Sequence, residues 1–337
     1  MATKSLAVKY RPRTFSEVVE QSATKVILQQ QLETGDIQNA YLFCGGAGTG
    51  KTTTARIFAN EANKGKGTPV EVDAASNNSV DDVRDIIKQA KLTSLDAEYN
   101  IFIMDEVHAL SSQAWQAMLK ILEEPPAKSI FILCTTDPQK IPKTILSRVQ
   151  RYNFQRISQK GIVSKLDYIL KEETCQKTTD MNLQALEFIA KQAQGGMRDA
   201  ITMLDKCLAY SSEVMISTVV TALGLSDYDT MCRFLSSIVE VDNTKQIEII
   251  NEVYMAGKDL KQFIKDFTYF VTDCCKFNLG ARDYITCPDT DEIMSVFKKV
   301  DLTDSTSLLN SLVRLQTDIK WDTNPLARIE AWCITKE

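Results

Sequence analysis

Residues 45–53, GGAGTGKTT, combine repeated glycines with a lysine and two threonines, and such a combination is suited to phosphate binding. The segment follows the apolar run AYLFC and precedes TTARIFANEA, which predicts a strand, a loop and a helix in succession. Glycines let backbone N–H groups turn inward around phosphate oxygens, and the helix N-terminus adds the positive end of its dipole. We expect Lys51 to reach the β- and γ-phosphates of a nucleotide and Thr52 to ligate Mg²⁺. The alternative, a purely structural turn, does not account for the motif in this setting.

Two adjacent carboxylates, Asp105 and Glu106, follow the apolar run NIFIM. A buried strand that delivers two acids to the carboxyl edge of a sheet pays a desolvation cost unless a cation lies beside them. We predict that Asp105 binds magnesium and that Glu106 orients and deprotonates the attacking water. The alternative is a pair of solvated loop acids. His108, the only histidine, is expected to pack or to make a polar contact rather than to catalyse.

A further apolar run, FILC, leads into Thr135 and Thr136. A hydroxyl at this place could sense the γ-phosphate or hold the attacking water. On residue type alone it could equally cap the turn before Pro138.

Short apolar runs alternate with helical patterns between about residues 41 and 154, namely AYLFCG, PVEVDA, NIFIMDE and SIFILCTT. Continuous apolar strands separated by helices are typical of a parallel sheet that is covered on both faces. After residue 154 the strand pattern fades and apolar residues recur at helical spacing. We therefore predict an α/β nucleotide-binding domain over residues 1–156, a small helical domain over 157–221 and an all-helical domain over 222–337.

The composition is that of an ordinary globular protein, with 44% hydrophobic and 25% charged residues in 337. A net charge of -5 argues against a surface devoted wholly to nucleic acid, although a local basic face is compatible with it. The sequence contains no apolar run long enough to cross a bilayer, so we expect a cytoplasmic protein without a membrane partner. The nine cysteines include no C-x-x-C pair and are expected to be reduced and buried.

Several longer motifs occur in one order along the chain: KYRPRTFSEVVEQ, GGAGTGKTT, VDAASNNSVDDVRDI, IMDEVHALS, KILEEPP, CTTDPQKIPKTILSRVQRYNF and GGMRDAITMLDK. This succession closely resembles the bacterial clamp-loader ATPases of the AAA+ class, the gamma/tau subunits of DNA polymerase III. The likeness is dense to about residue 210 and weaker through the remainder. It implies a lid domain and a collar domain after the P-loop domain. It further implies a motor subunit of a pentameric assembly, part of a DNA polymerase holoenzyme, that uses ATP to open a sliding clamp and load it onto primer-template DNA.

The resemblance also implies roles for individual residues. Thr136 takes the place of sensor 1, Arg198 that of sensor 2, and Arg148 that of an arginine finger that reaches the ATP of an adjacent subunit. On residue type alone, Arg198 could equally form a surface ion pair, and Arg148 could satisfy carbonyls at a helix end. The nucleotide-binding set that the family's motifs imply is Tyr10, Arg11, Pro12, Val18, Val19, Gly46, Gly48, Thr49, Gly50, Lys51, Thr52, Thr53 and Arg198.

DNA contacts are implied at the starts of two helices that face the interior of the assembly in this family. The residues concerned are Asn77, Asn78, Ser79, Ser112 and Gln113. Contacts of this kind hold the phosphate backbone and read shape, not sequence. The same residue types are also ordinary helix caps, so that alternative stays open.

The chain departs from the family's pattern in three places. The space where members usually carry a four-cysteine zinc module is only NEANKGKGTPV, so no zinc is expected. Val149 replaces the cysteine of the usual Ser-Arg-Cys. We also expect a short form of the subunit, without a tau-like extension after the collar. We hypothesise that a compact, zinc-free form of this kind is encoded by a phage or another mobile element. Two rival functions are a non-hydrolysing stator subunit of the same complex and a helicase-type ATPase, which the DEVH sequence suggests.

Overall fold

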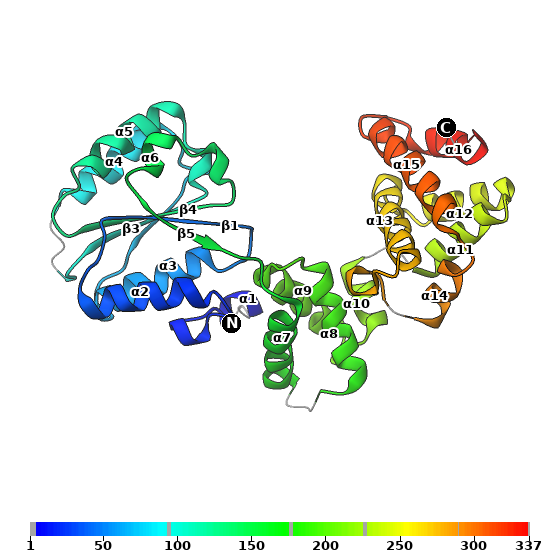
Figure 1. Ribbon diagram of the computed structural model, residues 1–337, viewed down its shortest axis with the longest axis horizontal. Coiled ribbons are helices and arrows are strands. Elements are labelled where there is room, and N and C mark those ends of the chain that lie inside the picture. The colour runs from blue at the N-terminus through cyan, green and yellow to red at the C-terminus, as the bar shows by residue number, and fades with distance from the viewer. Residues whose placement is uncertain (1–4, 93–95, 175–177, 225–227, 289, 336–337) are drawn as a thin grey trace. The chain divides into compact units, whose positions relative to one another are not determined.

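The structure is a computed structural model that describes residues 5–92, 96–174, 178–224, 228–288 and 290–335. The chain folds as two compact units, residues 1–209 and 210–337. The first unit contains a β-sheet with helices on both faces followed by further helices, and the second is helical (Figure 1). The predicted α/β class, with helical regions after the sheet, is confirmed. The finer boundaries that we placed after residues 156 and 221 remain predictions.

The described strands form one five-stranded parallel sheet in the order β2-β3-β4-β1-β5. Their bounds are β1 Ala40–Gly45, β2 Val70–Asp73, β3 Asn100–Asp105, β4 Ser129–Thr135 and β5 Gln150–Phe154. The strands β1, β3 and β4 are buried along nearly their whole length, which explains their continuous apolar sequences. Because parallel strands end at the same edge, the segments that follow β1, β3 and β4 come together there.

Helices cover both faces of this sheet. Their bounds in the first unit are α1 Leu6–Lys9, α2 Ser22–Thr34, α3 Lys51–Ala62, α4 Val80–Ala90, α5 Ser112–Glu123, α6 Lys143–Leu146, α7 Gln159–Thr174, α8 Asp180–Gln192 and α9 Met197–Tyr210, with short 3₁₀ turns at Phe15–Glu17, Val107–Ala109 and Pro138–Lys140. Figure 1 shows α2 and α3 on one face and α4, α5 and α6 on the other. Side chains alternate along β1 accordingly: Tyr41 and Phe43 pack toward α3, and Leu42 and Cys44 pack toward α4 and α5.

Three helices, α7 to α9, follow the sheet and complete the first unit. Ile162, Leu166 and Ile169 recur at helical spacing on the buried face of α7, which packs against α8. A capping box fixes the start of α8, because the Thr179 hydroxyl accepts from the backbone of Asn182 and the Asn182 side chain accepts from the backbone of Thr179.

The second unit is built around an aromatic core. Its helices are α10 Ile216–Leu223, α11 Tyr228–Val239, α12 Asn243–Met255, α13 Leu260–Asn278, α14 Asp291–Phe297, α15 Leu302–Ile319 and α16 Pro325–Thr335, with a 3₁₀ turn at Arg282–Tyr284. Phe234 is completely buried, and its ring lies 4.8 Å from that of Phe267 and 6.5 Å from that of Trp332. The helical periodicity of the sequence is therefore explained by one shared core.

The eight cysteines in the described ranges are buried, as expected, and Cys175 lies outside those ranges. Burial raises the pKa of the Cys44 and Cys207 thiols, which keeps them protonated and unreactive. Of the helices that the structure describes, none combines the length and apolar character that crossing a bilayer requires.

Candidate nucleotide-binding site

The P-loop connects the end of β1 to the start of α3 through a tight backbone turn. Gly48 and Gly50 have φ angles of 69° and 100°, a region that residues with a side chain rarely adopt. The Thr49 hydroxyl donates to the Gly46 carbonyl at 2.9 Å and fixes the loop from within. Lys51 is 6% exposed, and its ammonium donates to the carbonyls of Gly45 and Gly46, both at 2.9 Å. The loop thus holds a buried cation beside backbone N–H groups, which is an anion-binding arrangement.

The strand β3 brings the first predicted acid to this loop. The Thr52 hydroxyl donates to Asp105 Oδ2 at 2.6 Å, although the two residues are 53 positions apart. A hydroxyl and a carboxylate are the oxygen ligands that magnesium prefers, so this pair fits the predicted metal role. The pair therefore unites the two halves of the motif predicted from the sequence.

The second acid is held by the neighbouring strand end. Glu106 adopts a left-handed conformation, with φ 47°. Its Oε2 accepts from the Thr136 hydroxyl at 2.8 Å and from the Thr136 backbone N–H at 3.3 Å. His108 Nδ1 lies 3.2 Å from both Glu106 Oε2 and the Thr135 hydroxyl, so the histidine makes a polar contact, as expected. The Thr135 hydroxyl accepts from the Asp137 backbone N–H at 3.0 Å, whereas the 3₁₀ turn at Pro138–Lys140 is capped by Asp137, whose side chain accepts from the Gln139 backbone N–H.

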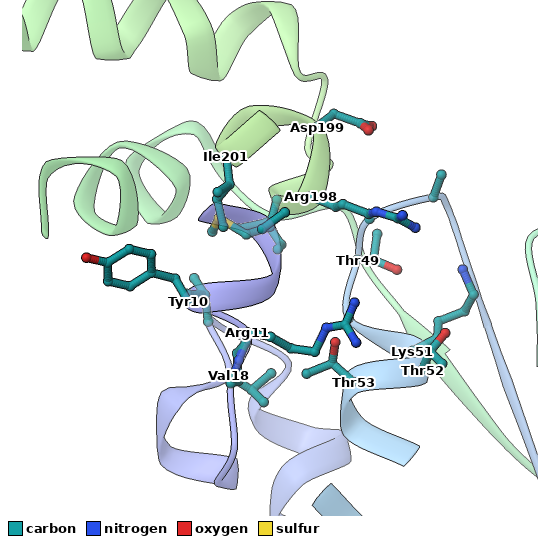
Figure 2. Close-up of a pocket in the computed structure, with 18 of the residues that line it drawn as sticks. Tyr10, Arg11, Val18, Thr49, Lys51, Thr52, Thr53, Arg198, Asp199 and Ile201 are labelled. Carbon is teal, nitrogen blue, oxygen red and sulfur yellow. The ribbon is translucent and has the colours of Figure 1, made fainter. Parts of the chain in front are cut away.

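A pocket of about 470 Å³ opens over the P-loop and is lined by several separate segments of the first unit (Figure 2). The predicted nucleotide-binding residues line it with one exception, Gly46, whose neighbour Ala47 takes its place. Of the predicted catalytic residues, Lys51, Glu106 and Arg198 line the pocket, whereas Thr136 and Arg148 do not. The residues from the sequence prediction that the pocket brings together are Tyr10, Arg11, Pro12, Val18, Val19, Gly48, Thr49, Gly50, Lys51, Thr52, Thr53, Asp105, Glu106 and Arg198.

The start of α9 rests directly on the P-loop. The Met197 backbone N–H donates to the Gly48 carbonyl at 3.0 Å, and a Cβ atom on Gly48 would lie only 3.0 Å from Gly196 Cα. In Figure 2, Arg198 extends toward Thr49, whereas Asp199 points away from the loop. Gly48 and Gly196, which have no side chains, therefore permit a close backbone approach that carries Arg198 to the phosphate-binding end of the pocket.

The N-terminal segment closes the opposite side of the pocket. Arg11 points toward Thr53 in Figure 2, while the Tyr10 ring extends away from the P-loop. The Tyr10 hydroxyl donates to Glu173 Oε1 of α7 at 2.5 Å, and Lys9 pairs with the same oxygen at 2.8 Å. Burial, followed by the bond to the Glu173 carboxylate, raises the pKa of the Tyr10 phenol. The two donors lower the pKa of Glu173, so this carboxylate stays ionised and ties α7 to the N-terminal segment.

Some lining residues were not predicted from the sequence. They are Ala7, Ala47, Arg56, Ile157, Lys165, Met197, Asp199 and Ile201. Met197 and Ile201 share a face of α9, since they are four positions apart, and the helical spacing of MRDAI could have indicated them. Ala47 and Asp199 are direct neighbours of predicted residues, whereas Ala7, Arg56, Ile157 and Lys165 reach the pocket through packing that no short motif indicates.

Two family models match this chain. One, described as "DNA polymerase III, delta subunit", matches residues 68–158, and the other, "DNA polymerase III clamp loader subunit, ATPase lid domain", matches residues 161–213. The DNA polymerase III subunit gamma of Buchnera aphidicola subsp. Acyrthosiphon pisum is 30% identical, and the match covers 86% of this chain and 86% of that protein. The chain belongs to the DNA polymerase III gamma/tau family.

Longer gamma/tau relatives match as well. DNA polymerase III subunit tau is 33% identical in Bacillus subtilis over 96% of this chain, and 35% identical in Escherichia coli over 76% of it. The chain spans 62% and 43% of those two proteins. Among solved structures, the Holliday junction branch migration motor RuvB of Thermotoga maritima has a TM-score of 0.52 at 18% identity, covering 75% of this chain and 88% of that one. Together these likenesses show an AAA+ ATPase fold with an ATPase lid for this gamma/tau chain.

Arg148 of this gamma/tau chain lies at the end of α6, away from the pocket lining. Its Nη1 donates to the Thr144 carbonyl at 2.7 Å and to the Ser147 hydroxyl at 3.0 Å. Its Nη2 pairs with Glu123 Oε1 of α5 at 2.6 Å. The contact with Thr144 is the helix-end interaction that the simpler interpretation of this arginine expects, and the role in trans remains a prediction.

The helix starts with predicted DNA contacts lie side by side, because the Ser111 backbone N–H donates to the Asn78 carbonyl at 3.2 Å. Ser79 caps α4 in a capping box with Asp82, whose pKa is lowered by these hydrogen bonds. Ser111 caps α5, so Ser112 is the first helical residue. The capping alternative thus holds for Ser79, while DNA contact at either helix remains a prediction.

Proposed function

We propose that this chain is an ATPase motor subunit of a sliding-clamp loader, which opens the processivity clamp and loads it onto primer-template DNA. The observation that carries the proposal is the pocket itself. It gathers a buried P-loop lysine, the Thr52–Asp105 pair, Glu106 and a lid arginine around one space. Family membership supplies the setting, because the relatives are subunits of DNA polymerase III.

The chain's own residues divide the work of binding and hydrolysis. Lys51 exchanges the two loop carbonyls for phosphate oxygens, which compete well for its three donors because they are charged. Thr52 and Asp105 would hold magnesium, which would supply positive charge to neutralise the phosphate oxygens. Arg198 adds a second cation from the lid, so closure of the lid and binding of the triphosphate favour each other.

Glu106 and Thr136 act on the attacking water in this proposal. Thr136 donates to the carboxylate that is to accept the proton, so it fixes the orientation of Glu106. Through this bond Thr136 also senses the γ-phosphate in our proposal, because a shift of Glu106 on nucleotide binding would move Thr136, and the reverse. His108, in contact with the same carboxylate oxygen, limits its rotation.

Arg148 is assigned to the ATP of an adjacent subunit. It lines no part of the described pocket of its own chain, and it is only partly exposed, with 34% of its side chain accessible. An arginine finger typically contributes about 10³ to 10⁵ in rate by stabilising charge on the transferred phosphoryl group. Placing this contribution across an interface makes hydrolysis depend on assembly. We propose a pentamer with other loader subunits, working on the clamp and DNA in the bacterial cytoplasm.

The two rival functions are less well supported. A stator subunit has no use for an intact hydrolytic site, yet Lys51 is buried in the P-loop and Thr52 contacts Asp105. The RuvB structures share only the fold with this chain at 18–20% identity, so they give a helicase-type function no specific support.

The predicted DNA contacts at α4 and α5 are compatible with phosphate binding by two adjacent helix starts.

The proposal is tested with the assembly purified from its native cells through a tag on this chain. We expect ATP hydrolysis to be stimulated by the sliding clamp and primed DNA. Arg148→Ala should abolish the stimulation while the affinity for ATP persists. Arg151→Ala is the matched control, because Arg151 is a nearby exposed arginine whose Nε donates to Asn153 Oδ1 on its own strand. Unstimulated hydrolysis, or equal effects of the two substitutions, would contradict the proposal.

A further inference from the structure

Arg148 is held by a carboxylate that no step of the proposed mechanism uses. Glu123 Oε1 lies 2.6 Å from Arg148 Nη2, and the two side chains are 49% and 34% exposed. The residues are 25 positions apart and come from α5 and from the end of α6, which pack on the same face of the sheet. An ion pair between two elements fixes the direction of the guanidinium more firmly than contacts within α6 alone.

The position of Glu123 is unfavourable for its own helix. It is the last residue of α5, where the helix dipole is negative, and the carboxylate of Glu124 follows at once. Pro125 and Pro126 then prevent the helix from continuing, so Glu123 stays at the C-terminal end of α5. A local cost of this kind is typical of a residue retained for a function.

The contacts of Arg148 hold it without saturating it. A guanidinium has five N–H donors, and the three acceptors seen here engage Nη1 and Nη2. Within the described residues, Nε has no hydrogen-bond acceptor. Nη1 and Nη2 are therefore held in place, while the guanidinium still has N–H groups that can donate to a phosphate oxygen.

We propose that Glu123 is a positioning residue for Arg148. It orients the guanidinium at the subunit surface before the ATP of a neighbour arrives, so less side-chain freedom is lost when the finger engages. The inference rests on the proposed role of Arg148 in trans. A carboxylate on an arginine finger could also compete with the phosphate. We favour positioning because the pair is a single, part-exposed contact, which a γ-phosphate with greater charge can share without breaking it.

The test compares Glu123→Gln with Glu124→Gln in the same purified assembly, supplied with clamp, primed DNA and ATP. Glu124 is the adjacent exposed carboxylate, so both variants remove one negative charge from the same turn. We expect Glu123→Gln to lower kcat about two- to five-fold, the range that corresponds to an exposed ion pair, while KM for ATP stays unchanged. Glu124→Gln should leave both constants unchanged. In an Arg148→Ala background, Glu123→Gln should have no further effect.

Each outcome bears on a separate statement. Equal kcat values for Glu123→Gln and Glu124→Gln would overturn the positioning role, and a raised kcat for Glu123→Gln would show that the carboxylate is inhibitory instead. A full effect of Glu123→Gln in the Arg148→Ala background would show that it acts through another group. Normal hydrolysis by Arg148→Ala alone would refute the proposed function, whatever Glu123 does. Size-exclusion chromatography of every variant checks that the assembly is intact.

Discussion

Replacing Gly48 by alanine tests whether the lid rests on the P-loop in solution. A Cβ atom at this position would lie 3.0 Å from Gly196 Cα and 3.3 Å from the Arg198 backbone nitrogen. Gly35 is a matched control, since its φ of 74° is close to the 69° of Gly48 and nothing lies within 4 Å of its Cβ position. Both substitutions carry the strain of the left-handed conformation, but only Gly48→Ala presses on α9.

The expected magnitudes follow from these contacts. A left-handed residue with a side chain costs about 1–2 kcal/mol, which both variants share. Overpacking against α9 adds about 1–3 kcal/mol at Gly48 if the lid stays in place. If the lid moves aside instead, the Met197–Gly48 hydrogen bond is lost, at about 0.5–1.5 kcal/mol, together with the packing around it. Either way Gly48→Ala should be less stable than Gly35→Ala by about 1 kcal/mol or more.

Urea unfolding without nucleotide measures the difference in stability between the two variants. Hydrogen exchange read by mass spectrometry measures how well the Met197 amide is protected. Peptides that contain Met197 should exchange faster in Gly48→Ala than in Gly35→Ala, because the Met197 N–H is the donor to the P-loop. Equal losses of stability and unchanged exchange at Met197 would refute the docking of the lid on the P-loop.

Three further outcomes are expected. Glu106→Gln should keep ATP binding and lose about 10²- to 10⁴-fold in hydrolysis, the usual contribution of a general base, and a variant with normal turnover would remove Glu106 from that role. Because hydrogen bonds from Lys9 and Tyr10 lower the pKa of Glu173, its contribution to stability is present above the ordinary carboxyl pKa of about 4.3 and is lost as pH falls below it. Thermal unfolding of Glu173→Gln should therefore depend less on acidification than that of the wild type, and parallel pH profiles would contradict this reasoning. Phe234→Ala should destabilise the second unit by about 3–5 kcal/mol, as seen in urea by the fluorescence of buried Trp332, and a loss below about 1 kcal/mol would show that the core repacks.

Those parts of the site that depend on local sequence could be predicted, and those that depend on distant packing could not. The P-loop and Asp105 follow continuous apolar strands, so their meeting at one sheet edge was predictable. The contact of Met197 with Gly48 depends on a backbone approach that only the folded lid shows. The Glu123–Arg148 pair joins the ends of two helices, and nothing in the sequence spacing indicates that these ends lie close together.

The first unit closes its pocket with segments from its two ends, and this has a consequence for how the protein is made. The Leu6 backbone N–H donates to Asp205 Oδ2 at 3.0 Å, across 199 positions of the chain. A ribosome that adds about 5–20 residues per second needs on the order of 10–40 s to span such a distance. During that time the strands of the sheet can pair, but no complete pocket exists. A nucleotide in this pocket would therefore contact the lid only after α9 has emerged, and truncations that end before α9 should gain less stability from nucleotide than the whole first unit.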